Sequence, residues 1–182
     1  RSVLLAGGHY NNWEWIATSL EQQIKHKTFA LYTPLSNKFF EKKMQQTRGK
    51  FGLTMVSIKK TAAFFEEYKN IPTATIFGID QSPRNPEKCY WMDFLNQETG
   101  VLFGLEKYAK EYNYPVLFCA ISKIKRGYYT VRFSLITDQP QDTPHGWIIE
   151  DTTQRLEQQI IKNPQYWLWS HKRWKHKRKL QS

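Results

Sequence analysis

The segment from Gly7 to Glu14, which reads GGHYNNWE, is the part of the 182-residue chain whose residue types and spacing suggest chemistry. It follows a short apolar run, and the two glycines let the backbone turn sharply, so His9 is expected at the lip of a strand-to-helix turn. A carboxylate bonded to one imidazole nitrogen fixes the tautomer and leaves the other nitrogen free as a base. We therefore predict His9 as a general base for a hydroxyl, with Glu14 as its orienting carboxylate. The pattern H-x4-E alone also occurs in ordinary surface turns.

The elements that must position this pair alternate between strand and helix along the chain. Apolar runs predict strands at 2–6, 28–32, 53–58, 73–79, 90–95, 116–122 and 128–137. Helical spacing predicts helices at 13–24, 36–46, 61–68, 99–112, 147–162 and 165–174, the first capped by Asn11 or Asn12. This order predicts an α/β fold, a mixed sheet flanked by helices, in a single domain over residues 1–182.

Charge and aromatic residues gather near the C-terminus. The chain has a net charge of +11, and residues 162–182 contain seven Lys and Arg without an acid. Such a field attracts nucleic acid, anionic lipid or an acidic carrier protein, and Trp side chains suit a membrane interface. We expect the basic aromatic segment 163–182 to contact an anionic membrane surface; binding of nucleic acid and a solvated face without a partner are the alternatives. The contact residues expected are Trp167, Trp169, Lys172, Arg173, Trp174 and Lys175.

Two further features limit the possible classes of protein. Cys89 and Cys119 lie in apolar, strand-like surroundings, which indicates reduced structural cysteines, and two isolated cysteines do not form a zinc site. No stretch approaches the ~18 apolar residues that span a bilayer. The chain begins with Arg1 inside an apparent strand, so we expect a fragment that lacks an N-terminal membrane anchor.

A series of further segments carries a family resemblance. They read YTPLSN at 32–37, RGK at 48–50, FGIDQ at 77–81, FLN at 94–96, GLEKYA at 104–109, YPV at 114–116 and NPQYWLWSHKRWK at 163–175. With the first turn, they resemble the late lipid A acyltransferases, known as lauroyl and myristoyl acyltransferases, within the glycerolipid acyltransferase superfamily that has an H-x4-D/E motif. The resemblance covers nearly the whole chain, and the string at 167–175 is its most specific part.

The resemblance implies an enzyme of the bacterial inner membrane, at the cytoplasmic face. Its members transfer a fatty acyl group from acyl carrier protein, or from coenzyme A, to a hydroxyl of a lipid A precursor or related glycolipid. No metal, cofactor or covalent acyl-enzyme is implied, and no nucleic-acid partner is expected. His9 and Glu14 match the catalytic motif, and the oxyanion would be met by backbone N–H groups near the glycine turn or by Arg48.

The resemblance also implies substrate-binding residues. Arg48, with neighbouring Lys50, matches a basic position expected to meet a phosphate or the thioester oxygen, although a cation also suits a helix C-terminus. Asp80 and Gln81 match a pair beside the site, or simply begin a loop.

Three further expectations concern the acceptor, a class of protein other than enzymes, and one ion pair. Many relatives have Arg at the position of Thr33, so the acceptor is open and a lysophospholipid or other glycolipid acyltransferase is the alternative enzyme. A basic nucleic-acid-binding module is the alternative outside enzymes. Glu106 and Lys110 are expected to form an exposed ion pair on a helix.

Overall fold

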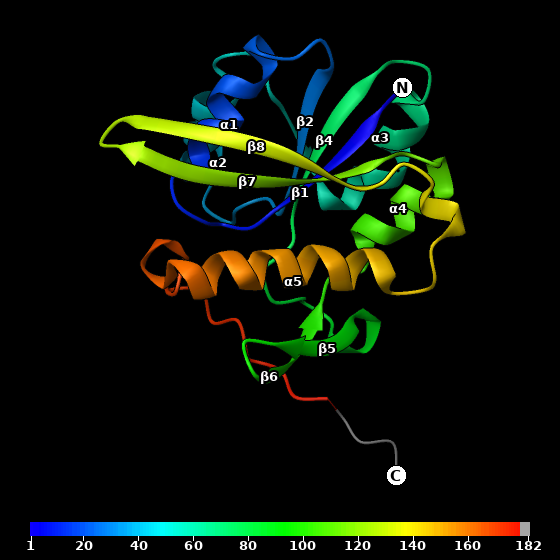
Figure 1. Ribbon diagram of the computed structural model, residues 1–182. Coiled ribbons are helices and arrows are strands. Elements are labelled where there is room, and N and C mark those ends of the chain that lie inside the picture. Colours follow the sequence, from blue (N-terminus) through cyan, green and yellow to red (C-terminus); the bar gives the residue numbers. More distant parts are fainter. Residues whose placement is uncertain (179–182) are drawn as a thin grey trace.

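The computed structural model describes residues 1–178, and its centre is a six-stranded sheet (Figure 1). The strand order is β3-β2-β4-β1-β7-β8. The strands are β1 Val3–Gly7, β2 Lys27–Tyr32, β3 Thr54–Ser57, β4 Thr73–Gly78, β7 Val116–Lys125 and β8 Tyr128–Thr137. The first five pair in parallel, whereas β8 runs antiparallel to β7. The predicted α/β fold with a mixed sheet is therefore confirmed. Residues 179–182, which end the basic segment predicted at 163–182, lie outside the described residues.

Helices cover both faces of this sheet. They are α1 Glu14–Ser19, α2 Lys38–Gly49, α3 Thr61–Tyr68, α4 Gly104–Tyr112 and α5 Trp147–Lys162. Central strands must therefore be apolar on both faces, and Leu4, Leu5 and Ala6 of β1 are all buried. Figure 1 shows α1 and α5 on opposite sides of β7 and β8. Among residues 1–178, no helix has both the length and the apolar character needed to cross a bilayer.

A two-stranded hairpin, β5 Tyr90–Phe94 and β6 Gln97–Val101, lies beyond α5, so that α5 stands between it and the main sheet (Figure 1). The predicted helix 99–112 is wrong over its first residues, because β6 continues to Val101 and α4 begins only at Gly104. The cause is the turn at Leu95 and Asn96, whose φ angles are 52° and 59°. Two successive left-handed residues make the tight turn that folds a strand back on its neighbour.

The C-terminal segment is not the helix predicted at 165–174. After α5 the chain makes one short 3-10 turn, η5 Pro164–Tyr166, and then runs irregularly to the β5–β6 hairpin. Its backbone pairs with the first turn instead: the Asn11 N–H donates to the Tyr166 carbonyl at 2.6 Å, and the Leu168 N–H to the His9 carbonyl at 3.2 Å. These bonds place Trp167 opposite Tyr10 in an antiparallel bridge. Asn11 takes a left-handed conformation in this turn and does not cap α1.

The N-terminus of α5 is capped by a residue from another helix. Glu106 is fully buried, and its carboxylate accepts hydrogen bonds from the N–H groups of Gly146 at 2.7 Å, Ile148 at 3.2 Å and Ile149 at 3.4 Å. The predicted pair with Lys110 is present at 3.3 Å, but it is not the exposed pair that was expected. Because the first N–H groups of a helix have no partner within it, the carboxylate supplies the acceptor that α5 lacks.

The two cysteines are unpaired. Cys119 is buried, and burial raises its pKa to about 12, so its thiol stays neutral at physiological pH. Cys89 is half-buried and its thiol lies 2.9 Å from the Pro86 carbonyl. The structural role predicted for them fits these surroundings.

Candidate active site

Two neighbouring parallel strands bring His9 and Asp80 to the same edge of the sheet. Gly7 of β1 is in register with Gly78 of β4. His9 and Asp80 each follow two residues after these glycines, at the carboxyl ends of the strands. In α/β proteins this edge is where ligands bind. A Cβ atom on Gly78 would lie 3.1 Å from Cε1 of His9, so the glycine makes room for the imidazole ring.

The imidazole of His9 is oriented by Asp80. Nδ1 of His9 lies 2.7 Å from Oδ1 of Asp80, and the His9 backbone N–H donates to Oδ2 at 2.9 Å. The Asp80 side chain is 3% exposed and that of His9 is 18% exposed. A proton on Nδ1 satisfies the carboxylate and leaves the lone pair of Nε2 as an acceptor, which faces the Gln81 amide nitrogen at 3.4 Å. Both residues of the predicted Asp80-Gln81 pair therefore lie at the histidine.

Trp167 completes the surroundings of Asp80. Its side chain is buried, and the indole N–H donates to Oδ2 of Asp80 at 2.8 Å. Burial alone would raise the pKa of Asp80, but hydrogen bonds and charge from His9, together with the Trp167 indole, outweigh it and lower the pKa below its ordinary value. Asp80 is thus held ionised beneath the histidine.

Glu14 is not the residue that orients His9. Its carboxylate accepts two hydrogen bonds from Arg48, at 2.9 Å from Nε and 2.6 Å from Nη2. The planar guanidinium matches a carboxylate in this two-bond geometry, and the nitrogens of the His9 ring already face Asp80 and Gln81. The predicted contact between Glu14 and His9 is therefore corrected: Asp80 takes that position, and a catalytic role for Glu14 remains a prediction.

Trp13 connects the two charged pairs. Its ring meets the His9 ring edge-on, with centroids 4.6 Å apart, and the Arg48 guanidinium lies 4.8 Å from the ring centroid of Trp13. Arg48, predicted from the sequence, is therefore at the site. Lys50 is exposed, and its ammonium lies 5.3 Å from the ring of Phe51. This contact involves neither the His9–Asp80 pair nor the Arg48–Glu14 pair.

Two of the six residues predicted to contact lipid, Trp167 and Arg173, are instead buried supports of the interior, which corrects the prediction for these two. Trp167 is 5% exposed and Arg173 is 3% exposed. Arg173 donates to the Gly100 carbonyl at 2.9 Å, and burial lowers its pKa to about 10. Half-buried Trp174 donates to Oγ1 of Thr99 at 2.8 Å. Of the six predicted contact residues, the exposed ones are Trp169, Lys172 and Lys175.

Another residue of this segment holds the loop that follows Asp80. Nε2 of His171 accepts a hydrogen bond from the Ser82 backbone N–H at 2.9 Å. Burial lowers the pKa of His171, which keeps that nitrogen available as an acceptor. His171 therefore has a structural role in this loop.

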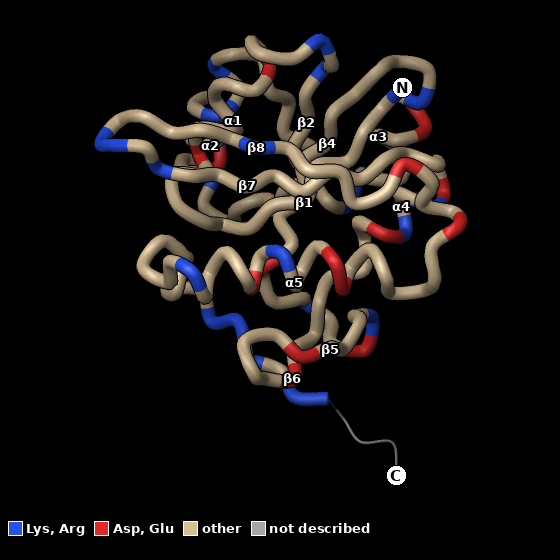
Figure 2. The backbone as a smooth tube through the Cα atoms, in the orientation of Figure 1, with Lys and Arg blue, Asp and Glu red and all other residues tan. Residues whose placement is uncertain are grey.

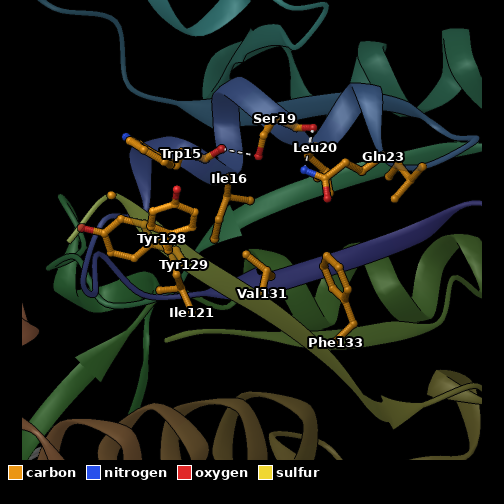
Figure 3. A pocket seen from close by; sticks show the side chains of 12 residues that line it. Trp15, Ile16, Ser19, Leu20, Gln23, Ile121, Tyr128, Tyr129, Val131 and Phe133 are labelled. Carbon is orange, nitrogen blue, oxygen red and sulfur yellow. Dashed lines mark hydrogen bonds between the residues drawn. The ribbon is translucent and has the colours of Figure 1, made fainter. Parts of the chain in front are cut away.

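A separate groove of about 370 Å³ lies between α1 and the β7–β8 hairpin (Figure 3). Trp15 and Ile16 line it on α1, and Tyr129, Val131 and Phe133 line it on β8, where alternate residues face the same side. None of the His9, Asp80, Arg48 or Glu14 side chains lines this groove. It is therefore distinct from the site around His9.

The sequence did not indicate the roles of two residues of the site, Trp13 and Trp167. Trp13 lay only within the helix predicted at 13–24, and Trp167 was predicted to contact a membrane surface. The available signal for Trp167 was general: a buried indole N–H requires an acceptor, and an ionised carboxylate is a strong one.

A histidine held by a buried carboxylate at the edge of an α/β sheet is an arrangement that can take a proton from a reacting group. The model of the bacterial lipid A biosynthesis acyltransferase family matches residues 1–176. The chain belongs to this family and is an acyltransferase, as the resemblance implied. A comparison with individual curated proteins gives no match.

Proposed function

We propose that this protein transfers a fatty acyl group from a thioester of acyl carrier protein to a hydroxyl of a lipid A precursor, with His9 as the general base; coenzyme A is the alternative carrier of the acyl group. The observation that carries the proposal is the 2.7 Å contact between Nδ1 of His9 and buried Asp80, which leaves the lone pair of Nε2 to accept a proton. Family membership supports an acyl donor and a lipid acceptor in general.

The reaction needs one base and no covalent enzyme intermediate. Nε2 of His9 removes the proton of the acceptor hydroxyl while its oxygen attacks the thioester carbonyl carbon. The new C–O bond forms, the C–S bond breaks, and the proton on Nε2 passes to the departing sulfur. Asp80 stabilises the imidazolium between these steps, because an ionised carboxylate beside Nδ1 favours the charged ring.

Arg48 is proposed to meet the negative charge of the substrate. Its side chain is 17% exposed, and Glu14 and Trp13 fix its guanidinium on two sides. A fixed cation stabilises a phosphate or the oxygen that becomes negative in the transition state. In this scheme Glu14 acts by positioning Arg48.

We further propose that the enzyme works at the cytoplasmic face of the bacterial inner membrane. A lipid acceptor is held in a bilayer, and the net charge of +11 favours an anionic surface. The alternative acceptor, a lysophospholipid or another glycolipid, is included in the test.

The test is mass spectrometry of a reaction that contains acyl carrier protein thioesters, a lipid A precursor and the purified protein. A product heavier by one acyl group is expected, and the His9→Ala variant should lose nearly all turnover while its circular dichroism spectrum stays unchanged. Parallel reactions with acyl coenzyme A and with lysophospholipids identify the donor and the acceptor. Turnover that persists in the folded variant would remove His9 from the mechanism.

A further inference from the structure

The dipeptide Phe-Phe occurs twice in helices of this protein, with opposite outcomes. In α3, Phe64 and Phe65 are 5% and 1% exposed and belong to the core. In α2, Phe39 and Phe40 are 64% and 59% exposed. Burying a phenylalanine side chain stabilises a fold, and α2 leaves two such side chains without that stabilisation.

Helix α2 is unusual because none of its twelve residues is buried. Most helices in proteins are stabilised by packing an apolar face, yet polar contacts hold this one. The Asn37 side chain accepts the N–H groups of Phe39 at 3.0 Å and Phe40 at 3.2 Å, which fixes the start of the helix. Glu41 accepts a hydrogen bond from Tyr32 at 2.6 Å and from the Leu35 N–H at 2.8 Å. These hydrogen bonds fix the start of α2, and the side chains of Phe39 and Phe40 are exposed on it.

The segment around α2 carries a large excess of positive charge. Residues 35–60 contain seven Lys and Arg and one acid, Glu41, a net charge of +6 out of +11 for the whole chain. The hydrogen bond from Tyr32 lowers the pKa of Glu41, and its carboxylate is engaged by β2 and the loop before α2. Lys43 lies over the Phe39 ring at 6.0 Å, so cation and apolar side chain share one surface. We define the α2 surface as the exposed residues Leu35, Lys38, Phe39, Phe40, Lys42 and Lys43.

We propose that the α2 surface docks this protein on an anionic phospholipid bilayer. Phenylalanine and leucine enter the boundary between head groups and acyl chains, and the lysines contact lipid phosphates. A helix that combines exposed apolar rings with Lys matches an interfacial helix, and charge complementarity selects anionic lipid. This proposal rests on the proposed function in one respect: a lipid acceptor gives the protein a reason to bind a bilayer.

The position of α2 gives the docking a consequence for the site. Arg48, in the last turn of the same helix, makes the ion pair with Glu14 and lies over Trp13. Helix α2 therefore joins the α2 surface, in its first turns, to a residue of the site in its last turn.

The β7–β8 hairpin provides a matched control. Figure 2 shows Lys and Arg at its projecting tip, where Lys123, Lys125 and Arg126 are exposed. Its tip also exposes Ile124 at 67% and Tyr128 at 59%. The hairpin tip thus also has three exposed cations and two exposed apolar side chains, but it is not part of the helix that carries Arg48.

The experiment is co-sedimentation of the 182-residue chain with vesicles of phosphatidylglycerol and phosphatidylcholine, beside vesicles of phosphatidylcholine alone. Binding is expected only with the anionic vesicles and should fall with added salt. Replacement of Lys38, Lys42 and Lys43 by Gln should weaken it about 100-fold, at roughly fivefold per cation. The double variant Phe39→Ser with Phe40→Ser should weaken it at least tenfold. Replacement of Lys123, Lys125 and Arg126 by Gln, or of Ile124 and Tyr128 by Ser, should change it less than threefold.

Other outcomes overturn the proposal. These are equal losses from the α2 and hairpin variants, loss from the hairpin variants alone, no binding of anionic vesicles, or an α2 variant that loses affinity for acyl carrier protein while keeping its affinity for vesicles. His9→Ala should bind vesicles like the wild type, and the α2 variants should keep turnover on acceptor dispersed in detergent micelles. Turnover by His9→Ala would therefore refute the proposed mechanism and leave the docking surface standing.

Discussion

Asp80 and Glu106 are both buried carboxylates that accept hydrogen bonds from three groups of the protein. The donors to Glu106 are three backbone N–H groups at the start of α5, with Lys110 beside them. The donors to Asp80 are a backbone N–H, an indole and the imidazole of His9. Among the groups around the two carboxylates, only the imidazole has a second nitrogen, Nε2, that can accept a proton from a substrate. Burial and full hydrogen bonding are thus common to a helix cap and to the proposed catalytic pair, and the second ring nitrogen of His9 distinguishes them.

The largest expected effect is that of Asp80→Asn on turnover. The amide would no longer hold the Nδ1 proton or stabilise the imidazolium, so kcat/KM should fall on the order of 10³- to 10⁴-fold. Mass spectrometry of the acylated product measures it, with circular dichroism as the control for folding. A folded variant within tenfold of the wild type would mean that Asp80, like Glu106, is structural.

The corresponding change at Glu106 should affect stability and leave the chemistry intact. Glu106→Gln replaces a charged acceptor of three N–H groups by an amide, and should cost about 2–3 kcal/mol of unfolding free energy. Urea denaturation measures the loss, and kcat of the folded variant should stay within twofold of the wild type. Lower activity at unchanged stability would contradict the assignment of Glu106 as a cap.

Trp167→Phe tests one donor of the catalytic carboxylate. An aromatic ring is kept, although it is smaller than the indole, and Asp80 loses the indole N–H; an interaction of about 1.4 kcal/mol corresponds to tenfold in rate. We expect kcat/KM to fall about tenfold. Trp169→Phe is the matched control, because Trp169 is 52% exposed and its indole donates to the Pro164 carbonyl. Equal losses in both variants would argue against a specific role of the contact with Asp80.

The smallest expected effect is on the pH dependence of stability. The pKa of Asp80 is lowered in the folded protein, so its ionised form stabilises the fold above the ordinary carboxyl pKa of 3.8. As the pH falls from that value through the folded pKa, the unfolded chain takes up the proton first and this stability is lost. Wild-type stability should therefore decline more steeply than that of Asp80→Asn below about pH 4. Parallel curves from denaturation at several pH values would contradict it.

The sequence predicted what depends on local spacing and missed what depends on strand order. The helix at Thr61–Tyr68 and the strand at Tyr128–Thr137 match the prediction, because their patterns are set by adjacent residues. His9 and Asp80 were both named, yet His9 was paired with Glu14, five residues away. The true partner is 71 positions away and becomes adjacent only because β1 and β4 pair in register.

The prediction for Trp167 and Arg173 was wrong for a related physical reason. Composition indicated that Trp167 and Arg173 suit a lipid surface, and the same side chains also suit a polar interior that offers acceptors. Asp80 and the Gly100 carbonyl are those acceptors, and they come from distant parts of the chain. Residue type alone does not distinguish the two environments. Exposure does: it excludes Trp167 and Arg173 as lipid contacts, whereas Trp169, Lys172 and Lys175 are exposed and their predicted contact with lipid stays a prediction.

The bridge between Tyr10 and Trp167 also bears on how the enzyme is made. A ribosome synthesises His9 first, Asp80 71 residues later and Trp167 a further 87 residues later. The turn around His9 therefore waits for a late segment, and such long loop closures slow folding. A nascent chain that ends shortly after residue 80 contains His9 and Asp80 but lacks Trp167, which bonds to Asp80. The complete set of contacts around Asp80 therefore forms only once residue 167 has left the ribosome.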